Sequence, residues 1–285
     1  MNARLQTRLR KGVSLLVAVA LILAFFPRET HAWGNNAQRL IVNRAVESLP
    51  YEIRPFFEAN RNFFVQHVND PMNQLDKHPN ERQNHFIELD KYGKFPFDAL
   101  PRNYKAAIAK YSKAKIDATG LLPWQIGVYS AKLTDDLRAG RWDEAKEDAA
   151  FLANYVAEAH DPFNTTENFD GTLSGQRGVN ERFNTMLIDR YGSFFPLNPH
   201  DASFISDPTD RAFDMCLNAH AYVESILLAD RAAKRGLSSY TDEYYDRFYN
   251  LAAGPLIRQL SDASTDVGSY WLTAWVNAGR PQLPR

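Results

Sequence analysis

Helical periodicity along the whole chain after residue 33 is the feature that most constrains its fold. In the first stretch, apolar residues recur three and four positions apart, at Leu40, Ile41, Ala45 and Leu49, and Pro50 ends the pattern. Such spacing places the apolar side chains on one face of an α-helix. The sequence contains no alternation long enough for a strand and no repeat of about 20–50 residues. The pattern therefore predicts an all-α, multi-helix domain.

Nine helices are predicted on this basis, with two long loops between them. The clearest helical periods cover 124–139 and 142–160, which Gly140 separates. Polar sequence containing proline or glycine predicts loops over 69–83 and 161–177, and long loops in compact domains are often functional. The remaining helices are predicted over 36–49, 55–68, 103–114, 178–191, 209–234, 241–260 and 263–278.

The first 32 residues have the three parts of a secretory signal peptide. Four basic residues precede an apolar run over 13–26, and Thr30 and Ala32 stand at the −3 and −1 positions of a cleavage site. The run is shorter than the about 20 apolar residues that a spanning helix needs, although an uncleaved anchor is the alternative. Cleavage after Ala32 predicts export to the periplasm or the medium of a bacterium. The mature domain, 33–285, would then begin at Trp33 and have no membrane span.

Composition limits what the mature domain can bind. Residues 1–32 carry five of the 33 basic and one of the 34 acidic residues, so the remainder holds 28 basic and 33 acidic residues, a net charge of −5. This balance argues against bulk binding of nucleic acid or anionic lipid. Cys216 is the single cysteine, so neither an internal disulfide nor a cysteine zinc site can form.

Three groups of polar residues are candidates for chemistry. Asp70 and His85 bracket the first loop. Asn180 and Asn184 are four apart and share one helical face, a spacing that metalloenzymes use for two ligands of one ion. Each residue also has a structural interpretation as a core histidine, a turn or a helix cap. The third group lies at and just beyond a helix end: Asn154, Glu158, His160 and Asn164.

The order of these residues resembles the zinc-dependent phospholipase C / S1–P1 nuclease family. The resemblance covers the whole mature chain, from an N-terminal Trp to a last helix ending in YWLTAWVNAG. It is densest in LANYVAEAHDPFN and NFDGTLSGQRGVNERFN, which are similar to the family patterns HYVxDxHxPxH and NxDGxxTxQxGxHxRFE. The resemblance implies an all-α fold of the phospholipase C / P1 nuclease type. It also implies phosphoester hydrolysis by a three-zinc cluster.

The resemblance keeps three of the family's nine metal-binding positions. Trp33 matches the N-terminal Trp, whose amine and carbonyl oxygen bind zinc, while Asp70 and His85 match a ligand aspartate and a ligand histidine. His160 matches a family histidine that is not a ligand. The other six positions are substituted: Gln38, Asn154, Asn164 and Asn180 stand for His, Glu158 for a bridging Asp, and Asn184 for an acidic ligand.

These substitutions imply the loss of most of the zinc chemistry. In the family, zinc acidifies a bound water and stabilises the charge on the phosphate. A neutral amide is a poor zinc ligand, so the zinc position now formed wholly by Asn residues is expected to hold no zinc. The central position keeps an imidazole and two carboxylates, from His85, Asp70 and Glu158. At most one zinc or other divalent metal ion is expected, held there with Trp33 as a weaker ligand.

Three functions are compatible with this pattern. The chain is a pseudoenzyme or binding protein that holds a small phosphate-bearing or polar ligand in the former cleft, or a reduced phosphoester hydrolase with one metal at Asp70, His85 and Glu158, or a helical interaction protein with an inert cleft. Amides have both hydrogen-bond donors and acceptors. They therefore either line a polar cavity that is kept for binding, or merely occupy the space of the former metal ions. Six substitutions among nine positions favour the first function over the second.

Overall fold

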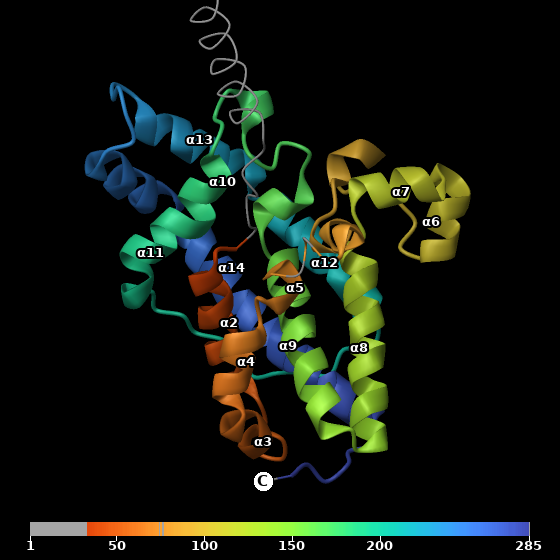
Figure 1. Cartoon of the computed structure of the whole chain (residues 1–285). Helices are drawn as coiled ribbons and strands as arrows, with labels where there is room; N and C mark the ends of the chain where they lie inside the picture. Colours follow the sequence, from red (N-terminus) through yellow and green to blue (C-terminus); the bar gives the residue numbers. More distant parts are fainter. Residues whose placement is uncertain (1–32, 74, 76, 285) are drawn as a thin grey trace, which may run out of the picture. The chain divides into compact units, whose positions relative to one another are not determined.

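The computed structural model describes residues 33–73, 75 and 77–284, and every regular element in that part of the chain is a helix (Figure 1). Ala32–Arg285 form one compact unit. Within the described residues, no helix combines the length and the apolar character that crossing a membrane requires. The predicted signal peptide, 1–32, lies outside the described residues.

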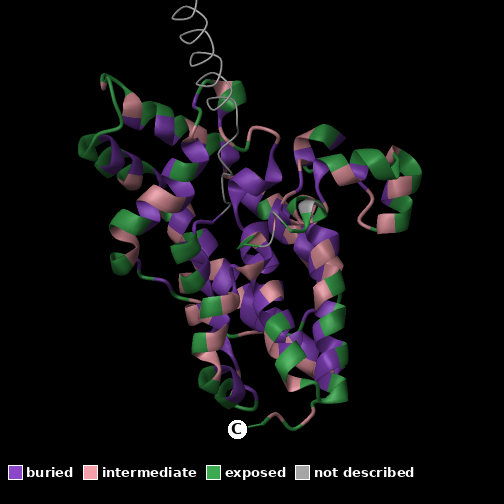
Figure 2. Ribbon diagram, viewed as in Figure 1, coloured by how far each residue is buried: buried purple, intermediate pink, exposed green. Residues whose placement is uncertain are grey.

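The longest helix, α14 (Asp242–Asn277), is the centre of the packing. It contacts α2 (Asn35–Ser48), α8 (Leu122–Ala139), α9 (Trp142–Ala159) and α13 (Val223–Lys234). Figure 2 shows α9 buried along most of its length, because α14, α8 and α2 cover it. A helix buried on several sides can place polar side chains away from water, and α9 carries two of the sequence-predicted site residues.

Trp271 joins three parts of the core. Its ring stacks on Phe57 at a centroid distance of 4.5 Å and lies 5.2 Å from the ring of Phe64. Its indole Nε1 donates a hydrogen bond to the carbonyl oxygen of Ala149, at 3.0 Å. These contacts tie α14 to α9 and to the two short helices α3 (Arg54–Ala59) and α4 (Arg61–His67). Aromatic rings bury large areas and so contribute strongly to core stability.

Short helices and turns complete the unit. The α-helices are α5 (Asp70–Asn73), α6 (Tyr104–Tyr111), α7 (Lys113–Thr119), α10 (Val179–Glu181), α11 (Leu187–Tyr191) and α12 (Pro208–His220). A π-helical segment, η5 (Arg182–Met186), joins α10 to α11, and the 3-10 turns are η1 (Pro79–His85), η2 (Leu89–Tyr92), η3 (Pro162–Thr165), η4 (Thr172–Ser174) and η6 (Gly192–Phe194).

Three predicted helices are each divided in the structure. The one predicted over 103–114 breaks at Ser112, which has a φ of 71°. The helix predicted over 55–68 breaks at Asn60, whose side-chain Nδ2 bonds back to the carbonyl oxygen of Phe56 at 2.8 Å. Asparagine competes in this way with regular helical bonding. The helix predicted over 209–234 breaks at Ala221 and Tyr222, where the Tyr222 N–H bonds to a carbonyl three residues back instead of four.

The opposite error occurs near the C-terminus, where the helices predicted over 241–260 and 263–278 are one continuous α14. Ser261 and Asp262 separate the two predicted helices. In the structure, the Ser261 hydroxyl donates to the carbonyl of Ile257 at 2.8 Å, and Thr265 donates to Ser261 in the same way. These side chains bond within the helix, and the packing of α2 and α9 on α14 favours its continuation.

Candidate functional site

His85 and Glu158 lie in direct contact. Glu158 belongs to the last turn of α9, and His85 ends η1, which packs on α9. The imidazole Nδ1 lies 2.6 Å from Glu158 Oε2, and both side chains are buried. On the other side of the ring, Nε2 lies 3.2 Å from Glu81 Oε1, an ion-pair distance outside hydrogen-bond geometry. The imidazole therefore stands between two carboxylates.

The two carboxylates influence the charge of the His85 imidazole. Burial alone lowers the pKa of His85, but the carboxylates of Glu158 and Glu81 outweigh burial and raise the pKa to about 9. The carboxylates thus favour the imidazolium form of His85, while burial also raises the pKa of its partner Glu158. Burial acts to raise the pKa of Glu81, yet the nearby His85 imidazole and the hydrogen bond from the Tyr155 hydroxyl lower it overall. The group is thus a buried ion pair extended by a second carboxylate.

Asp70 pairs with a different residue, although its helix α5 packs on both α9 and η1. It begins α5, and its Oδ2 lies 2.7 Å from Nδ1 of His67, with the Asp70 side chain one-third exposed. In the described part of the chain, no hydrogen bond or ion pair joins Asp70 to His85 or Glu158. The structure brings together two of the three residues predicted for the central metal position and places Glu81 beside them.

Asn180 and Asn184 form a second polar group with Asp161. The Asn184 Nδ2 donates to Asp161 Oδ2 at 2.7 Å and to Asn180 Oδ1 at 3.0 Å. All three side chains are buried. Asn184 lies in the π-helical segment η5, and such segments are frequent at functional sites because they reorient side chains. Asn164, in η3, donates to the backbone carbonyl of Glu158 at 3.4 Å, which links the two groups.

Two further amides are buried without partners. Gln38 lies on α2, which contacts both α9 and η5, and Asn154 lies on α9 one turn before Glu158. Gln38 is 1% exposed and Asn154 is 0% exposed, yet neither side-chain oxygen nor nitrogen of either residue has a hydrogen-bond partner among the described residues. The Oδ1 of Asn184 is unpartnered as well. We call the following five residues the amide cluster: Gln38, Asn154, Asn164, Asn180 and Asn184.

Trp33 is anchored beside the amide cluster. Its side chain is 2% exposed, and its indole Nε1 donates to the carbonyl oxygen of Ala157 at 2.7 Å. The N–H of Gly34 bonds to the backbone oxygen of Asn184 at 3.3 Å. The predicted cleavage after Ala32, which would free the amine of Trp33, lies outside the described residues. The start of the described chain is therefore held against the last turn of α9 and η5.

His160 has a structural role. Its Nε2 lies 2.9 Å from Asp266 Oδ2, and its Nδ1 lies 3.2 Å from Gln259 Oε1, so it joins the end of α9 to α14. Arg211 also pairs with Asp266, at 2.7 Å, so that the carboxylate is shared between Arg211 and His160.

Asp161 and Glu81 are not among the residues that the sequence pattern indicates. Asp161 is fully buried, and its Oδ1 accepts the N–H of Phe163 at 2.9 Å. Burial raises its pKa to about 7, even though the bonds from Phe163 and Asn184 act to lower it. Two sequence signals were available. Asp161 directly follows His160 in the A-H-D-P turn, and Glu81 stands four residues before His85.

The residues present do not fit a three-zinc cluster. Zinc binds imidazole, thiolate and carboxylate donors, whereas the second polar group offers two amides and one carboxylate. Among the described residues, no three or more His, Cys, Asp or Glu side chains are close enough together to hold a metal ion. Of the two ring nitrogens of His85, Nδ1 is at hydrogen-bond distance from Glu158, whereas Nε2 has no hydrogen-bond partner among the described residues.

Comparisons with known proteins show the fold alone. No family model matches this sequence, and no curated protein matches it. Among solved structures, the alpha toxin from Clostridium absonum is similar, with a TM-score of 0.54 and 13% sequence identity over 91% of this chain and 68% of the toxin chain. The similarity confirms the all-α, phospholipase C-type fold that the sequence predicts.

Proposed function

We propose that this chain is an exported pseudoenzyme that binds a small polar ligand in the amide cluster, on a phospholipase C-type fold. The observation that supports this function is the set of five buried, unpartnered side-chain atoms on Gln38, Asn154 and Asn184. Each unpaired buried polar atom costs about 1–3 kcal/mol. A bound polar molecule that pairs with these atoms would recover that cost.

The opposing interpretation is that the amides only fill the old metal positions. In that case the amides should pair with one another, as Asn184 and Asn180 do at 3.0 Å. Gln38 and Asn154 do not, although they are buried as deeply. Fully satisfied polar networks are the norm in protein interiors, so the unpaired pair favours a retained binding function.

The charges near the cluster favour an uncharged ligand over a free phosphate. Three acidic residues lie in or beside it: Glu81, Glu158 and Asp161. The imidazolium of His85 already stands between two of them. Each unpartnered amide of Gln38 and Asn154 offers both a donor and an acceptor, which matches hydroxyl or amide groups of a ligand.

The test uses substitutions that remove the polar atoms and keep the volume, Gln38→Met and Asn154→Leu. The probes are glycerol, glycerol 3-phosphate and inorganic phosphate, with binding measured by calorimetry and by thermal unfolding. Glycerol is expected to bind the wild type and neither variant; at 100 times its Kd it would stabilise the wild type by about 2.7 kcal/mol. The proposal fails if no probe binds, or if binding survives both substitutions.

A second candidate is a reduced metal-dependent phosphoester hydrolase with one metal at Asp70, His85 and Glu158. The contact between His85 and Glu158 favours it, and Glu81 adds a carboxylate. Asp70 would have to leave His67 to take part. About one zinc, iron or manganese per chain in the mature protein, lost in His85→Ala, would establish this function. Protein without stoichiometric transition metal would rule it out.

A further inference from the structure

Two buried aspartates meet across the hairpin that α8 and α9 form. Asp136 lies in the last turn of α8, and Asp148 lies in the second turn of α9. Asp136 is 4% exposed and Asp148 is 2% exposed, and their carboxyl groups are within hydrogen-bonding reach of each other. Two carboxylates in contact repel each other, and burial adds to the cost of ionising both.

The hydrogen bonds of the two carboxyl groups leave one oxygen of each without a donor. Asp136 Oδ1 accepts from Nε of Arg141 at 2.8 Å, and Asp148 Oδ1 accepts from Nζ of Lys132 at 2.6 Å. The Oδ2 atoms of both aspartates are buried and have no hydrogen-bond partner among the described residues. An ionised carboxylate is an acceptor only, so two of them cannot satisfy each other. A single proton between the two groups would give both Oδ2 atoms a partner.

The cations beside the pair are too exposed to replace that proton. Lys132 and Tyr129 face Asp148 from α8, and Arg141 faces Asp136 from the turn after α8. The side chains of Lys132 and Arg141 are 56% and 48% exposed, so solvent screens their charges. Among the described residues, the other helices that pack on α8 and α9 place no charged side chain in an ion pair with either carboxyl group.

The acidities of the two groups agree with this geometry. Burial and the contact with Asp136 raise the pKa of Asp148 to about 7, although Lys132 acts to lower it. Burial acts to raise the pKa of Asp136 as well, but the bonds from Asp148 and Arg141 lower it overall. The proton therefore belongs to Asp148, and Asp136 accepts it in a hydrogen bond.

We propose that Asp136 and Asp148 share one proton, which makes their contact a pH-sensitive switch in the α8–α9 hairpin. While the proton is present, an O–H···O bond joins the two helices; without it, two like charges are in contact. A free aspartate ionises near pH 3.9, so this stabilisation is fully present below about pH 4 and is lost as the pH rises through 7. The inference does not depend on the proposed function, but α9 also carries Asn154 and Glu158.

The direct test is carbon-13 NMR of the aspartate carboxyl groups in the mature protein, titrated from about pH 4 to 9. We expect one carboxyl signal that titrates near neutral pH and is absent in Asp148→Asn. Asp136→Asn replaces the neighbouring charge by an amide that can donate, so it should lower the midpoint of Asp148 by at least about one pH unit. Asp161→Asn is the control, because the pKa of Asp161 is also raised to about 7 and this variant should remove only its own signal.

Urea unfolding at the same pH values tests the effect on the fold. The amide in Asp148→Asn can donate to Asp136 at every pH, so this variant keeps the contact between the helices. Between about pH 4 and 8, the unfolding equilibrium constant of the wild type should rise at least about tenfold more than that of Asp148→Asn. The inference is wrong if both aspartates of the folded wild type titrate below about pH 5. It is also wrong if the wild type and Asp148→Asn unfold with the same pH dependence.

Discussion

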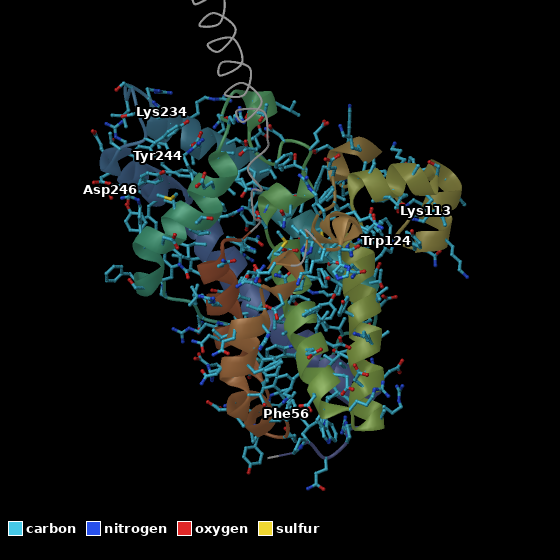
Figure 3. All side chains as sticks on the ribbon, in the orientation of Figure 1. Phe56, Lys113, Trp124, Lys234, Tyr244 and Asp246 are labelled. Carbon is cyan, nitrogen blue, oxygen red and sulfur yellow. The ribbon has the colours of Figure 1, made fainter. Side chains whose placement is uncertain are left out.

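Two buried polar groups lie side by side on the same stretch of chain, and they are organised in opposite ways. Arg182 stands between Asn180 and Asn184, but its guanidinium pairs with Asp230 at 2.9 Å and bonds to the Tyr244 hydroxyl at 3.1 Å. Figure 3 marks Tyr244, which lies near the start of α14. We call Arg182, Asp230, Tyr244 and Gln176 the Arg182 network.

The Arg182 network is fully satisfied. All three guanidinium nitrogens of Arg182 donate, both carboxylate oxygens of Asp230 accept, and Gln176 uses its nitrogen on Asp230 and its oxygen on Arg231. Among the described residues, Gln38 and Asn154 in the amide cluster have neither kind of partner. The difference indicates that the Arg182 network stabilises the fold. The unpaired amides of the amide cluster destabilise it, and a binding function would explain why they are present.

The largest effect is expected when the satisfied network is broken. Arg182→Met leaves Asp230 buried without its cation and should lower the free energy of unfolding by about 3–5 kcal/mol. Urea unfolding measures the loss. Arg247→Met is the control, because Arg247 pairs with Glu243 on the exposed face of α14 and should cost at most about 1 kcal/mol. Equal losses in the two variants would contradict the structural role of the Arg182 network.

The pair of His85 and Glu158 beside the amide cluster should make the free energy of unfolding depend on pH. The pKa of His85 rises from 6.5 to about 9 on folding, so its stabilisation is fully present below about pH 6.5 and is lost as the pH rises through 9. The full effect is about 3 kcal/mol. Unfolding at several pH values should show this loss in the wild type and not in His85→Gln. The half-exposed control His67→Gln should keep the wild-type pH dependence; a wild type stable across this range would contradict the assignment.

The smallest expected effect comes from the same substitution, Gln to Met, made once in the Arg182 network and once in the amide cluster. It compares the two groups most directly. Gln176→Met removes a partnered amide and should destabilise the protein by about 1–3 kcal/mol. Gln38→Met removes an unpartnered amide and should leave the stability unchanged or raise it. Chemical denaturation of the two variants in parallel measures the difference. A similar loss of unfolding free energy in both variants would contradict this, because it would mean that Gln38, like Gln176, has hydrogen-bond partners in solution.

Local sequence determined the helices with the clearest periodicity. The helices predicted over 124–139 and 142–160 are found as Leu122–Ala139 and Trp142–Ala159, with Gly140 in the left-handed conformation between them. The sequence failed where tertiary packing outweighed local preference. The helices predicted over 241–260 and 263–278 are one helix, because neighbouring helices pack along the length of α14.

The candidate site was only partly predictable. The sequence pattern indicated that His85 and Glu158 belong together, and they do. It also indicated Asp70, which pairs instead with His67, three residues earlier in the chain. It missed Asp161 and Glu81, because a single acidic residue after a helix or inside a loop has many ordinary roles. Their importance depends on burial, which the sequence does not contain.

The sequence by itself determined the helical fold class, the single cysteine and the presence of amides at 38, 154, 164, 180 and 184. Only the tertiary structure decided which of those amides are paired. Asn180 and Asn184 share one helical stretch and bond to each other, whereas Gln38 and Asn154 come from different helices and remain unpaired. The physical reason is that the cost of an unpaired amide arises only when packing removes water from it. Residues on α2, α9 and η5 meet only in the folded chain.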